Sequence, residues 1–180
     1  LDPTQTPGEN AQRYFAKYNK QKRTFEALTE LIQETADDIQ YLESISNALD
    51  IALSEADLAQ IKEELMQSGY IRRKHTKKKV KLTSKPMHYI SSDGYDMYVG
   101  KNNLQNEELT FSFANGNDWW FHAKGAPGSH VIVKSGGDEL PDRTFEEAGR
   151  LAAYYSKNRG ADKVEIDYIQ KKHVKKPNGA

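Results

Sequence analysis

Four residues that could carry hydrolytic chemistry lie close together in the sequence: Asp118, His122, Ser129 and His130. A serine hydrolase needs its histidine to take a proton from the serine hydroxyl. Adjacent side chains on a β-strand point to opposite faces, so Ser129 and His130 are poorly placed to share a proton. Ser129 also lacks the glycine pattern of a nucleophile elbow. We therefore predict no catalytic residue and interpret the chain as a binding protein rather than an enzyme.

A metal site is the second chemistry that these residues suggest. His122 and His130 are predicted to lie opposite each other across a hairpin, where Asp118 could be a third ligand. The spacing matches no known metal motif, and the chain has no cysteine for a zinc–thiolate site or a disulfide. The glycines of segments 94–100 and 125–128 do not have the spacing of a phosphate-binding loop. The sequence therefore predicts no bound metal and no cofactor.

A dense run of lysine and arginine occupies residues 72–85. Such a run attracts nucleic acid at long range, because contacts with phosphates release condensed counterions. The alternative is a flexible, solvated linker, and the two interpretations are compatible. The candidate RNA-binding residues of this run are Arg72, Arg73, Lys74, Lys77, Lys78, Lys79 and Lys81.

Three consecutive aromatic residues, Trp119, Trp120 and Phe121, lie within a predicted strand. Because strand side chains alternate, at least one ring must lie on each face. We predict that one tryptophan belongs to the core and that the other is an exposed platform on which RNA bases stack. The alternative is a strand buried on both faces. The lysines expected to supply charge near such a platform are Lys101, Lys124, Lys172 and Lys175.

The composition places these candidates on the basic half of the chain. Of the 180 residues, 37% are hydrophobic and 29% are charged, and the formal net charge is zero. Residues 1–70 carry six basic and thirteen acidic side chains and residues 71–180 carry twenty and thirteen, so the halves have formal charges of −7 and +7. This asymmetry favours nucleic-acid contact by the second half. No apolar stretch approaches the ~20 residues that span a bilayer, and no signal peptide is visible, so we expect part of a larger intracellular protein.

A heptad pattern predicts one continuous helix over residues 9–50. No proline or glycine interrupts residues 9–68, and apolar residues recur at alternating steps of three and four. A seam of this length would be sticky if it were exposed alone, so we expect a partner helix or a homodimer. The two rows of the seam are Ala11, Tyr18, Phe25, Ile32, Ile39 and Ser46, and Tyr14, Gln21, Leu28, Thr35, Leu42 and Leu49.

A second, shorter helix is predicted between Ser54 and Gly69. Ser54 and Asp57 have the spacing of a capping box, and Gly69 is a typical stop. Its apolar face is predicted to contain Leu58, Ile61 and Leu65. We expect residues 1–70 to be a helical arm, 71–85 a basic linker and 86–180 an α+β domain truncated at its C-terminal end.

The domain from residue 86 onward is predicted to be a small, mainly antiparallel sheet with one packed helix. Turn residues at 92–94 and 125–128 separate pairs of β-rich runs and indicate two hairpins. Thr144 and Glu147 suggest a capping box, and Leu151, Ala152 and Tyr155 are expected on the inner face of the helix. The predicted strands are 88–90, 96–99, 109–113, 119–124, 130–134 and 164–168, and the predicted helix is about 144–158.

Long contiguous motifs in this domain resemble the domain called NFACT-R, which occurs in the family of bacterial fibronectin-binding protein A and RqcH and in their eukaryotic ribosome-quality-control relatives. The resemblance is carried by segments 98–103, 106–109, 118–124 and 127–132, while 9–15, 18–20 and 41–44 resemble the coiled-coil region of bacterial members such as streptococcal ones. The motif positions singled out are Gly100, Asn102, Asn103, Asp118, His122, Gly128, Ser129 and His130.

The resemblance implies a concrete function. Members of the family bind the large ribosomal subunit carrying a stalled peptidyl-tRNA, contact rRNA and tRNA, and support addition of an alanine tail to the nascent chain. It implies a cytoplasmic RNA-binding module without membrane contact. The alternative that it implies is an adhesin segment that binds host fibronectin at the cell surface, reached without a signal peptide.

Overall fold

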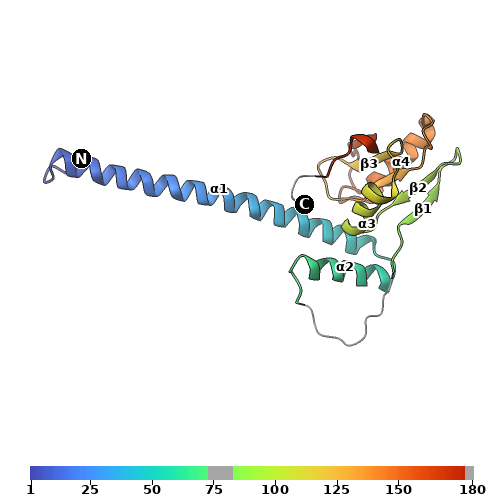
Figure 1. Ribbon diagram of the computed structural model, residues 1–180, viewed down its shortest axis with the longest axis horizontal. Coiled ribbons are helices and arrows are strands. Elements are labelled where there is room, and N and C mark those ends of the chain that lie inside the picture. Colours follow the sequence, from blue (N-terminus) through green and yellow to red (C-terminus); the bar gives the residue numbers. More distant parts are fainter. Residues whose placement is uncertain (73–82, 177–180) are drawn as a thin grey trace. The chain divides into compact units, whose positions relative to one another are not determined.

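The computed structural model describes residues 1–72 and 83–176 (Figure 1). The chain forms two compact units, residues 1–41 and 42–180. The helix α1 (Pro7–Ile51) begins in the first unit and ends in the second. Six of the predicted phosphate contacts lie outside the described residues: Arg73, Lys74, Lys77, Lys78, Lys79 and Lys81.

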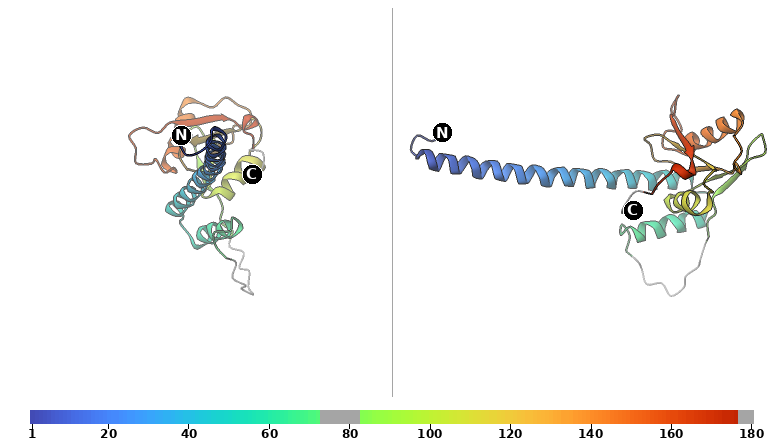
Figure 2. Two further views of the ribbon diagram at one scale, coloured as in Figure 1. Left: turned by 90° about the vertical axis from the view of Figure 1, so that its left-hand side faces the viewer. Right: turned by 45° about the horizontal axis from the view of Figure 1, so that its top comes forward.

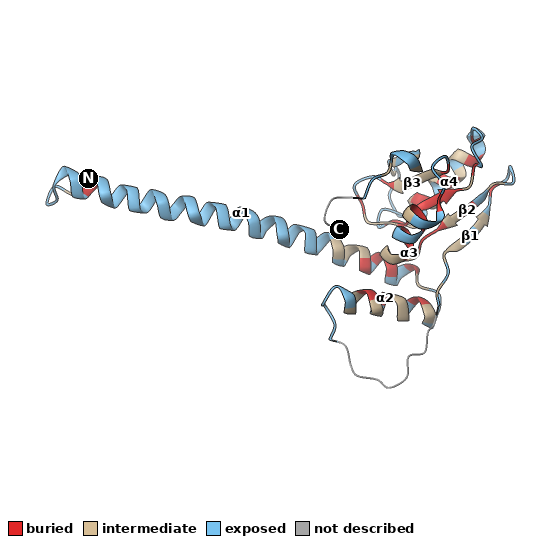
Figure 3. Ribbon diagram, viewed as in Figure 1, coloured by how far each residue is buried: buried red, intermediate tan, exposed pale blue. Residues whose placement is uncertain are grey.

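The first unit is the N-terminal part of α1 with its cap. Thr6 and Glu9 form a reciprocal capping box, in which the Glu9 carboxylate accepts from the N–H of Thr6 (2.8 Å) and the Thr6 hydroxyl accepts from the N–H of Glu9 (3.3 Å). The continuous helix predicted over residues 9–50 is confirmed. The predicted seam is exposed along this part, where Phe25 is 72% and Ile32 68% exposed (Figure 3).

The second unit starts with a helical hairpin. The last turns of α1 bury Ile45, Ala48 and Ile51, and α2 (Glu55–Gln67), which runs beside them in Figure 2, buries Ile61. The predicted capping box at Ser54 is confirmed, because its side chain accepts from the N–H of Asp57 while Asp57 accepts from the N–H of Ser54. The prediction for Leu58 is wrong: it is exposed, and Asp57 and Glu64 are buried on the inner face instead.

A five-stranded antiparallel sheet in the order β1-β2-β4-β3-β5 forms the centre of the second unit. Both predicted hairpins are present, and the predicted α+β class is confirmed. Positive φ angles at Gly94 and Gly125 explain why glycine stands in the two turns. The strands are β1 (Met87–Ile90), β2 (Asp96–Val99), β3 (Trp119–Ala123), β4 (Val131–Val133) and β5 (Ile166–Gln170).

One face of the sheet is covered by α4 (Asp142–Tyr154). Phe121, Val131 and Val99 are fully buried between the sheet and the small residues Ala148 and Ala152 of the helix. The predicted inner-face residues of this helix, which also include Leu151 and Tyr155, are in contact with this core. Apolar burial on this face therefore fixes the strand register, because a shift by one residue would reverse every side chain.

The opposite face is covered in part by α3 (Asn103–Glu108) and the π-helical turn η1 (Leu109–Phe113). The strand predicted for residues 109–113 is therefore wrong. Asn102 caps α3 by accepting from the N–H of Gln105, and the helix runs directly into η1, where the N–H of Ala114 bonds to Leu109. Leu109 and Thr110 are consequently buried on the sheet rather than paired in it.

Three further boundaries differ from the predicted ones. The helix α4 begins at Asp142, so Thr144 lies inside it, and its hydroxyl donates to the carboxylate of Asp93 (2.7 Å) and shares a hydrogen bond with the hydroxyl of Ser91 (2.9 Å) instead of capping. It ends at Tyr154, before the predicted residue 158, because the chain turns to form a bridge between Ser156 and Gly128. Finally, β5 begins two residues later than predicted, at Ile166. No helix in the described part of the chain is long and apolar enough to cross a membrane.

Candidate nucleic-acid interface

The two tryptophans of β3 lie on opposite faces of the sheet. Trp119 is on the α4 face, where its ring centroid is 5.6 Å from that of Phe145. Trp120 is on the other face, against the buried Leu109, Ala114 and Ile132. Both side chains are only half-buried. Each face therefore receives one indole, as the alternation of strand residues requires.

Two histidines surround the ring of Trp120. His122 stacks on it at a centroid distance of 5.6 Å, and His130 meets it edge-on at 5.1 Å. The imidazoles lie 5.3 Å apart, and Nδ1 of His130 shares a 2.8 Å hydrogen bond with the hydroxyl of Thr110. The predicted position of the two histidines opposite each other across the hairpin matches this geometry.

Both imidazoles are held in the neutral form. Burial lowers the pKa of His122, outweighing a hydrogen bond to the Gly128 backbone and the charge of Asp167. Burial and the neighbouring His122 lower the pKa of His130 to about 3, against a hydrogen bond to the backbone of Asn106. The ring cluster is thus uncharged at neutral pH, which suits contact with the faces of nucleobases.

Asp118 is kept apart from this cluster. Its carboxylate accepts from Nζ of Lys134 (2.5 Å) and from the N–H of Asn115 (2.7 Å). The residues considered for a hydrolytic triad or a metal site are therefore not assembled, and no group of three potential ligands exists among the described residues. Ser129 is buried, and its N–H donates to the carbonyl of Tyr155 at 3.0 Å.

The lysines after β5 are fixed beside the start of β3. The N–H of Lys171 bonds to the carbonyl of Asp118 (2.8 Å) and that of Lys172 to Gly116 (2.9 Å), which holds the turn η2 (Lys171–His173) against the loop before the tryptophans. Lys172 and Lys175 are exposed. Two of the predicted RNA-binding lysines, Lys172 and Lys175, thus lie three positions apart on the segment that is bonded to the start of β3.

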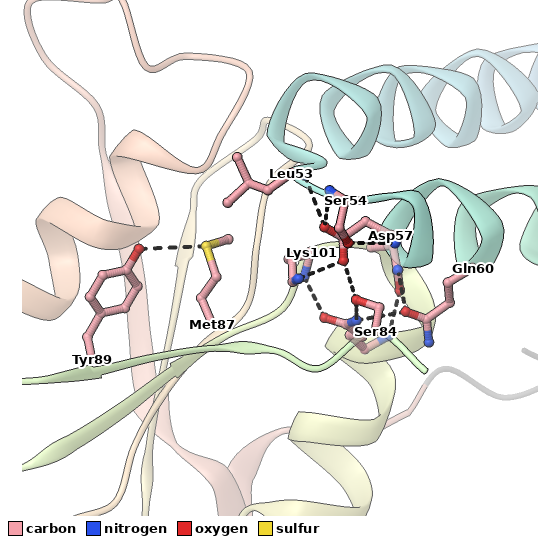
Figure 4. Close-up of polar contacts among 10 residues, drawn as sticks. Leu53, Ser54, Asp57, Gln60, Ser84, Met87, Tyr89 and Lys101 are labelled. Carbon is pink, nitrogen blue, oxygen red and sulfur yellow. Dashed lines mark hydrogen bonds and ion pairs between the residues drawn. The ribbon is translucent and has the colours of Figure 1, made fainter. Parts of the chain in front are cut away.

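The remaining predicted lysines and arginines differ in their surroundings. Lys124 is exposed and pairs with Glu165 at 3.1 Å, and this hydrogen bond and charge raise its pKa. Arg72 is exposed just after α2. Lys101 differs from all of these: its side chain is only 12% exposed and its Nζ lies 2.6 Å from the buried carboxylate of Asp57 (Figure 4).

The other motif residues organise the chain around β4 and α3. A Cβ at Gly100 would lie 2.2 Å from Oδ1 of Asn106, and a Cβ at Gly128 would lie 2.9 Å from Ser156, so both positions require glycine. Asn106 accepts from the N–H of His130 (2.9 Å) and donates to the carbonyl of Gly128 (3.2 Å). It therefore aligns the segment that carries His130.

Asn102 and Asn103 reach the helical hairpin. Asn102 donates to Gln60 at 2.9 Å, and Asn103 donates to both Ser44 and Glu64 at 2.7 Å. The local spacing of Asp57, Gln60, Glu64, Ser84 and Gln105 did not indicate these bonds, because the bonded residues are 21 to 45 positions apart in the sequence. Asp57 was found only as a helix cap.

The chain belongs to the NFACT family, because models of this family match it along its length. Residues 1–84 match the model of the NFACT N-terminal and middle domains, and residues 85–180 match that of the NFACT protein RNA binding domain. These matches confirm the resemblance that the sequence motifs indicated. The matched RNA binding domain is a binding module and not a catalytic domain.

Within that family, the chain is similar to proteins called Rqc2 homolog RqcH. It is 47% identical to the one from Streptococcus pneumoniae serotype 2 over 99% of the chain, and 42% identical to the one from Bacillus subtilis over the whole chain. In both cases it covers 32% of the relative's length, so it spans about a third of the curated relatives that it matches.

A solved structure has the same fold. It is described as the C-terminal of the fibronectin/fibrinogen-binding protein from Streptococcus suis, and the TM-score is 0.86 at 45% sequence identity. The match covers 98% of this chain and 70% of that chain.

Proposed function

We propose that this chain is the part of a ribosome quality-control factor that contacts RNA on the large ribosomal subunit. The single observation that carries the proposal is the uncharged ring cluster of Trp120, His122 and His130 on β3 and the adjoining chain, with the exposed Lys172 and Lys175 on the segment that is bonded to the start of β3. The match to an RNA-binding domain and the similarity to RqcH proteins support it. Aromatic rings stack on bases, and lysines contact phosphates.

The two kinds of residue are proposed to have separable roles. Lys172 and Lys175 supply phosphate contacts on the sheet domain, to which Arg72, Lys124 and the basic residues from Arg73 to Lys81 add long-range attraction. Phosphate contacts position a protein without selecting a sequence. The ring of Trp120 supplies stacking on an unpaired base. Trp119 is assigned to the core, since it faces α4.

A salt titration of RNA binding by the 180-residue chain tests this proposal. Replacing Lys172 and Lys175 by glutamine should weaken binding to single-stranded RNA and flatten the plot of log K against log salt by about 0.7 per lost contact. The matched control is Lys62→Gln, an exposed lysine on α2, which should leave both quantities unchanged. Equal slopes for the parent and the double variant would remove these lysines from the interface.

Replacement of Trp120 should have a different signature. Trp120→Leu should lower affinity by about 1–3 kcal/mol at an unchanged salt slope, because a stack but no charge is lost. The unfolding midpoint of the same variant must be measured, since the side chain also contacts the buried Ile132. Charge reversal of Lys77, Lys78 and Lys79 should instead weaken binding to every RNA and flatten the slope.

The wider role belongs to the full-length protein. We propose that it acts in the cytoplasm on stalled large subunits carrying peptidyl-tRNA, contacts rRNA and tRNA, and supports alanine tailing of the nascent chain. In cells producing a stalled reporter, full-length protein with the Lys172 and Lys175 substitutions should leave fewer alanine tails than the parent protein at equal abundance. Undiminished tailing would separate this interface from that activity.

Fibronectin binding is the second candidate function, because the structurally similar streptococcal protein is described as binding fibronectin and fibrinogen. A competition experiment between large ribosomal subunits and fibronectin distinguishes the two candidate functions. If the surface is for RNA, purified large subunits should bind the chain and excess fibronectin should not displace them. Saturable fibronectin binding that is insensitive to RNA and to the Lys172 and Lys175 substitutions would support the adhesin function.

A further inference from the structure

A buried carboxylate lies where α2 meets the sheet domain. Asp57 is 1% exposed, and its Oδ1 accepts from Nζ of Lys101 at 2.6 Å and from the hydroxyl of Ser84. Its Oδ2 accepts from the N–H groups of Leu53 and Ser54, both at 3.0 Å. Figure 4 shows the three side chains converging from α2, the segment before β1 and the segment after β2. We call Asp57, Ser84 and Lys101 the Asp57 cluster.

This cluster joins its elements in one specific arrangement. Burial alone would raise the pKa of Asp57, but the hydrogen bonds from Lys101, Ser84 and the helix-cap N–H groups hold it well below its usual range. The ion pair is therefore present at neutral pH. A buried charge that loses its partner is strongly destabilising, and hydrogen bonds require a defined distance and angle between donor and acceptor. Any arrangement of α2 and the sheet domain that separates Asp57 from Lys101 is therefore disfavoured.

We call the contact between the α1–α2 hairpin and the sheet domain the joint. A second row of hydrogen bonds extends the joint to α1. Asn103 donates to Ser44 of α1 and to Glu64 of α2, so that one side chain ties both helices to the start of α3. Gln105 donates to Gln60 (2.7 Å) and to Ser84 (2.8 Å), the residue that also bonds to Asp57. The turn between β2 and α3 is thus bonded to the whole helical hairpin.

The segment after α4 holds the end of α1 from another side. Lys157 forms an ion pair with Glu43, and Asn47 donates to the carbonyl of Tyr155 at 3.3 Å. The last turns of α1 are therefore bonded to two separate parts of the sheet domain. A hinge between the hairpin and the sheet would have to break both sets of bonds.

We propose that Lys101 is a positioning residue that does not contact RNA, and that the Asp57 cluster fixes the direction of the RNA-binding sheet relative to the α1–α2 hairpin. The inference rests on the proposed function. Its consequence is that the exposed Lys172 and Lys175, which follow β5, and the exposed Arg72, which follows α2, are held in one arrangement for contact with the large subunit. Rigid presentation of two contact regions raises the effective concentration of the second once the first has bound.

Amide hydrogen exchange of the 180-residue chain tests the joint without RNA. In Asp57→Asn and in Lys101→Met, amides of α2 and of residues 101–106 should exchange faster than in the parent, while those of β3 and β4 should not. The double variant Asp57→Asn/Lys101→Met leaves no unpaired buried charge and should exchange more slowly than Lys101→Met alone. If Lys101→Met does not fold, Asp57→Asn and Asn103→Ala give the same measurement. Unchanged exchange in α2 would overturn the joint.

RNA-binding measurements distinguish a positioning role of Lys101 from direct contact with RNA. A short single-stranded oligoribonucleotide can occupy the sheet face alone, so Asp57→Asn and Lys101→Met should bind it as tightly as the parent and with the same salt slope. Binding to purified large subunits should weaken by about ten-fold or more, because the second contact region is no longer held in place. The sign for Asp57→Asn is decisive: loss of a negative charge cannot weaken attraction to phosphates directly.

Each remaining outcome has one meaning. A flatter salt slope for Lys101→Met with the oligonucleotide would make Lys101 a phosphate contact and overturn the proposal. Equal or tighter binding of Asp57→Asn to subunits would also overturn it. Failure of the parent chain to bind any RNA would refute the proposed function, while the hydrogen-exchange result would still decide whether the joint exists.

Discussion

The environment of His130 makes the folded state sensitive to acid. Its pKa is about 3 in the folded chain against an ordinary value of 6.5, whereas the unfolded chain takes up the proton near the ordinary value. Because the unfolded state then binds more protons, the free energy of unfolding should fall as the pH is lowered from about 6.5 towards about 3. The groups facing this ring are neutral His122, Thr110 and Trp120, and none can stabilise an imidazolium by an opposite charge.

Urea unfolding at several pH values measures this effect. His130→Gln should show a flatter dependence than the parent between about pH 6.5 and about pH 4, since glutamine does not titrate. If the His130 variant and the parent have the same slope, His130 is not held neutral in the folded chain.

At the scale of residues, the sequence predicted those features that depend only on neighbouring positions in the chain. The alternation of strand side chains correctly placed one tryptophan on each face, and the Ser54–Asp57 capping box was found from spacing alone. The role of Lys101 could not be found in this way. Its partner Asp57 lies 44 positions earlier, and a lysine beside a Gly-Asn-Asn run has the same local appearance whether its ammonium is buried or solvated.

At the scale of elements, the helix α4 is the one whose packing was predicted in most detail. Leu151→Ala should lower the free energy of unfolding by about 2 kcal/mol, the lower end for large-to-small core changes, because Leu151 is only half-buried against the core cluster. The neighbouring Arg150→Ala removes an exposed side chain and is the matched control. Chemical denaturation measures both, and an unchanged midpoint for Leu151→Ala would refute the packing of this face.

The segment from Leu109 to Phe113 shows why one element was predicted wrongly. Leu, Phe and Phe alternate with Thr and Ser, which is the period of a strand. The cap at Asn102 starts a helix that continues into this segment. Both edges of β4 are already paired, one with β2 and the other with β3, so this segment cannot pair with β4. A five-residue apolar pattern therefore could not distinguish the two structures without the tertiary context.

At the scale of the whole chain, the division into domains does not follow a single boundary. The two family models meet between residues 84 and 85, whereas the second compact unit reaches back to Leu42 and includes α2. The bonds of Asp57, Asn103 and Glu43 across this line are the physical reason, because they tie helices from one model to the sheet of the other. The helical hairpin and the sheet domain are therefore expected to unfold together.

The exposed seam of α1 predicts self-association of the isolated chain. Phe25 and Ile32 are 72% and 68% exposed on one row of the heptad pattern, and a second copy of the helix would remove both from water. Sedimentation velocity should show a weight-average mass that rises with concentration. Phe25→Gln/Ile32→Gln should remain monomeric over the same range, while Lys20→Gln, which lies on the outer side of the helix away from both rows, should associate like the parent. A compact monomer at every concentration would show that the seam does not pair with its own copy, and the partner helix would then have to come from another segment of the full-length protein.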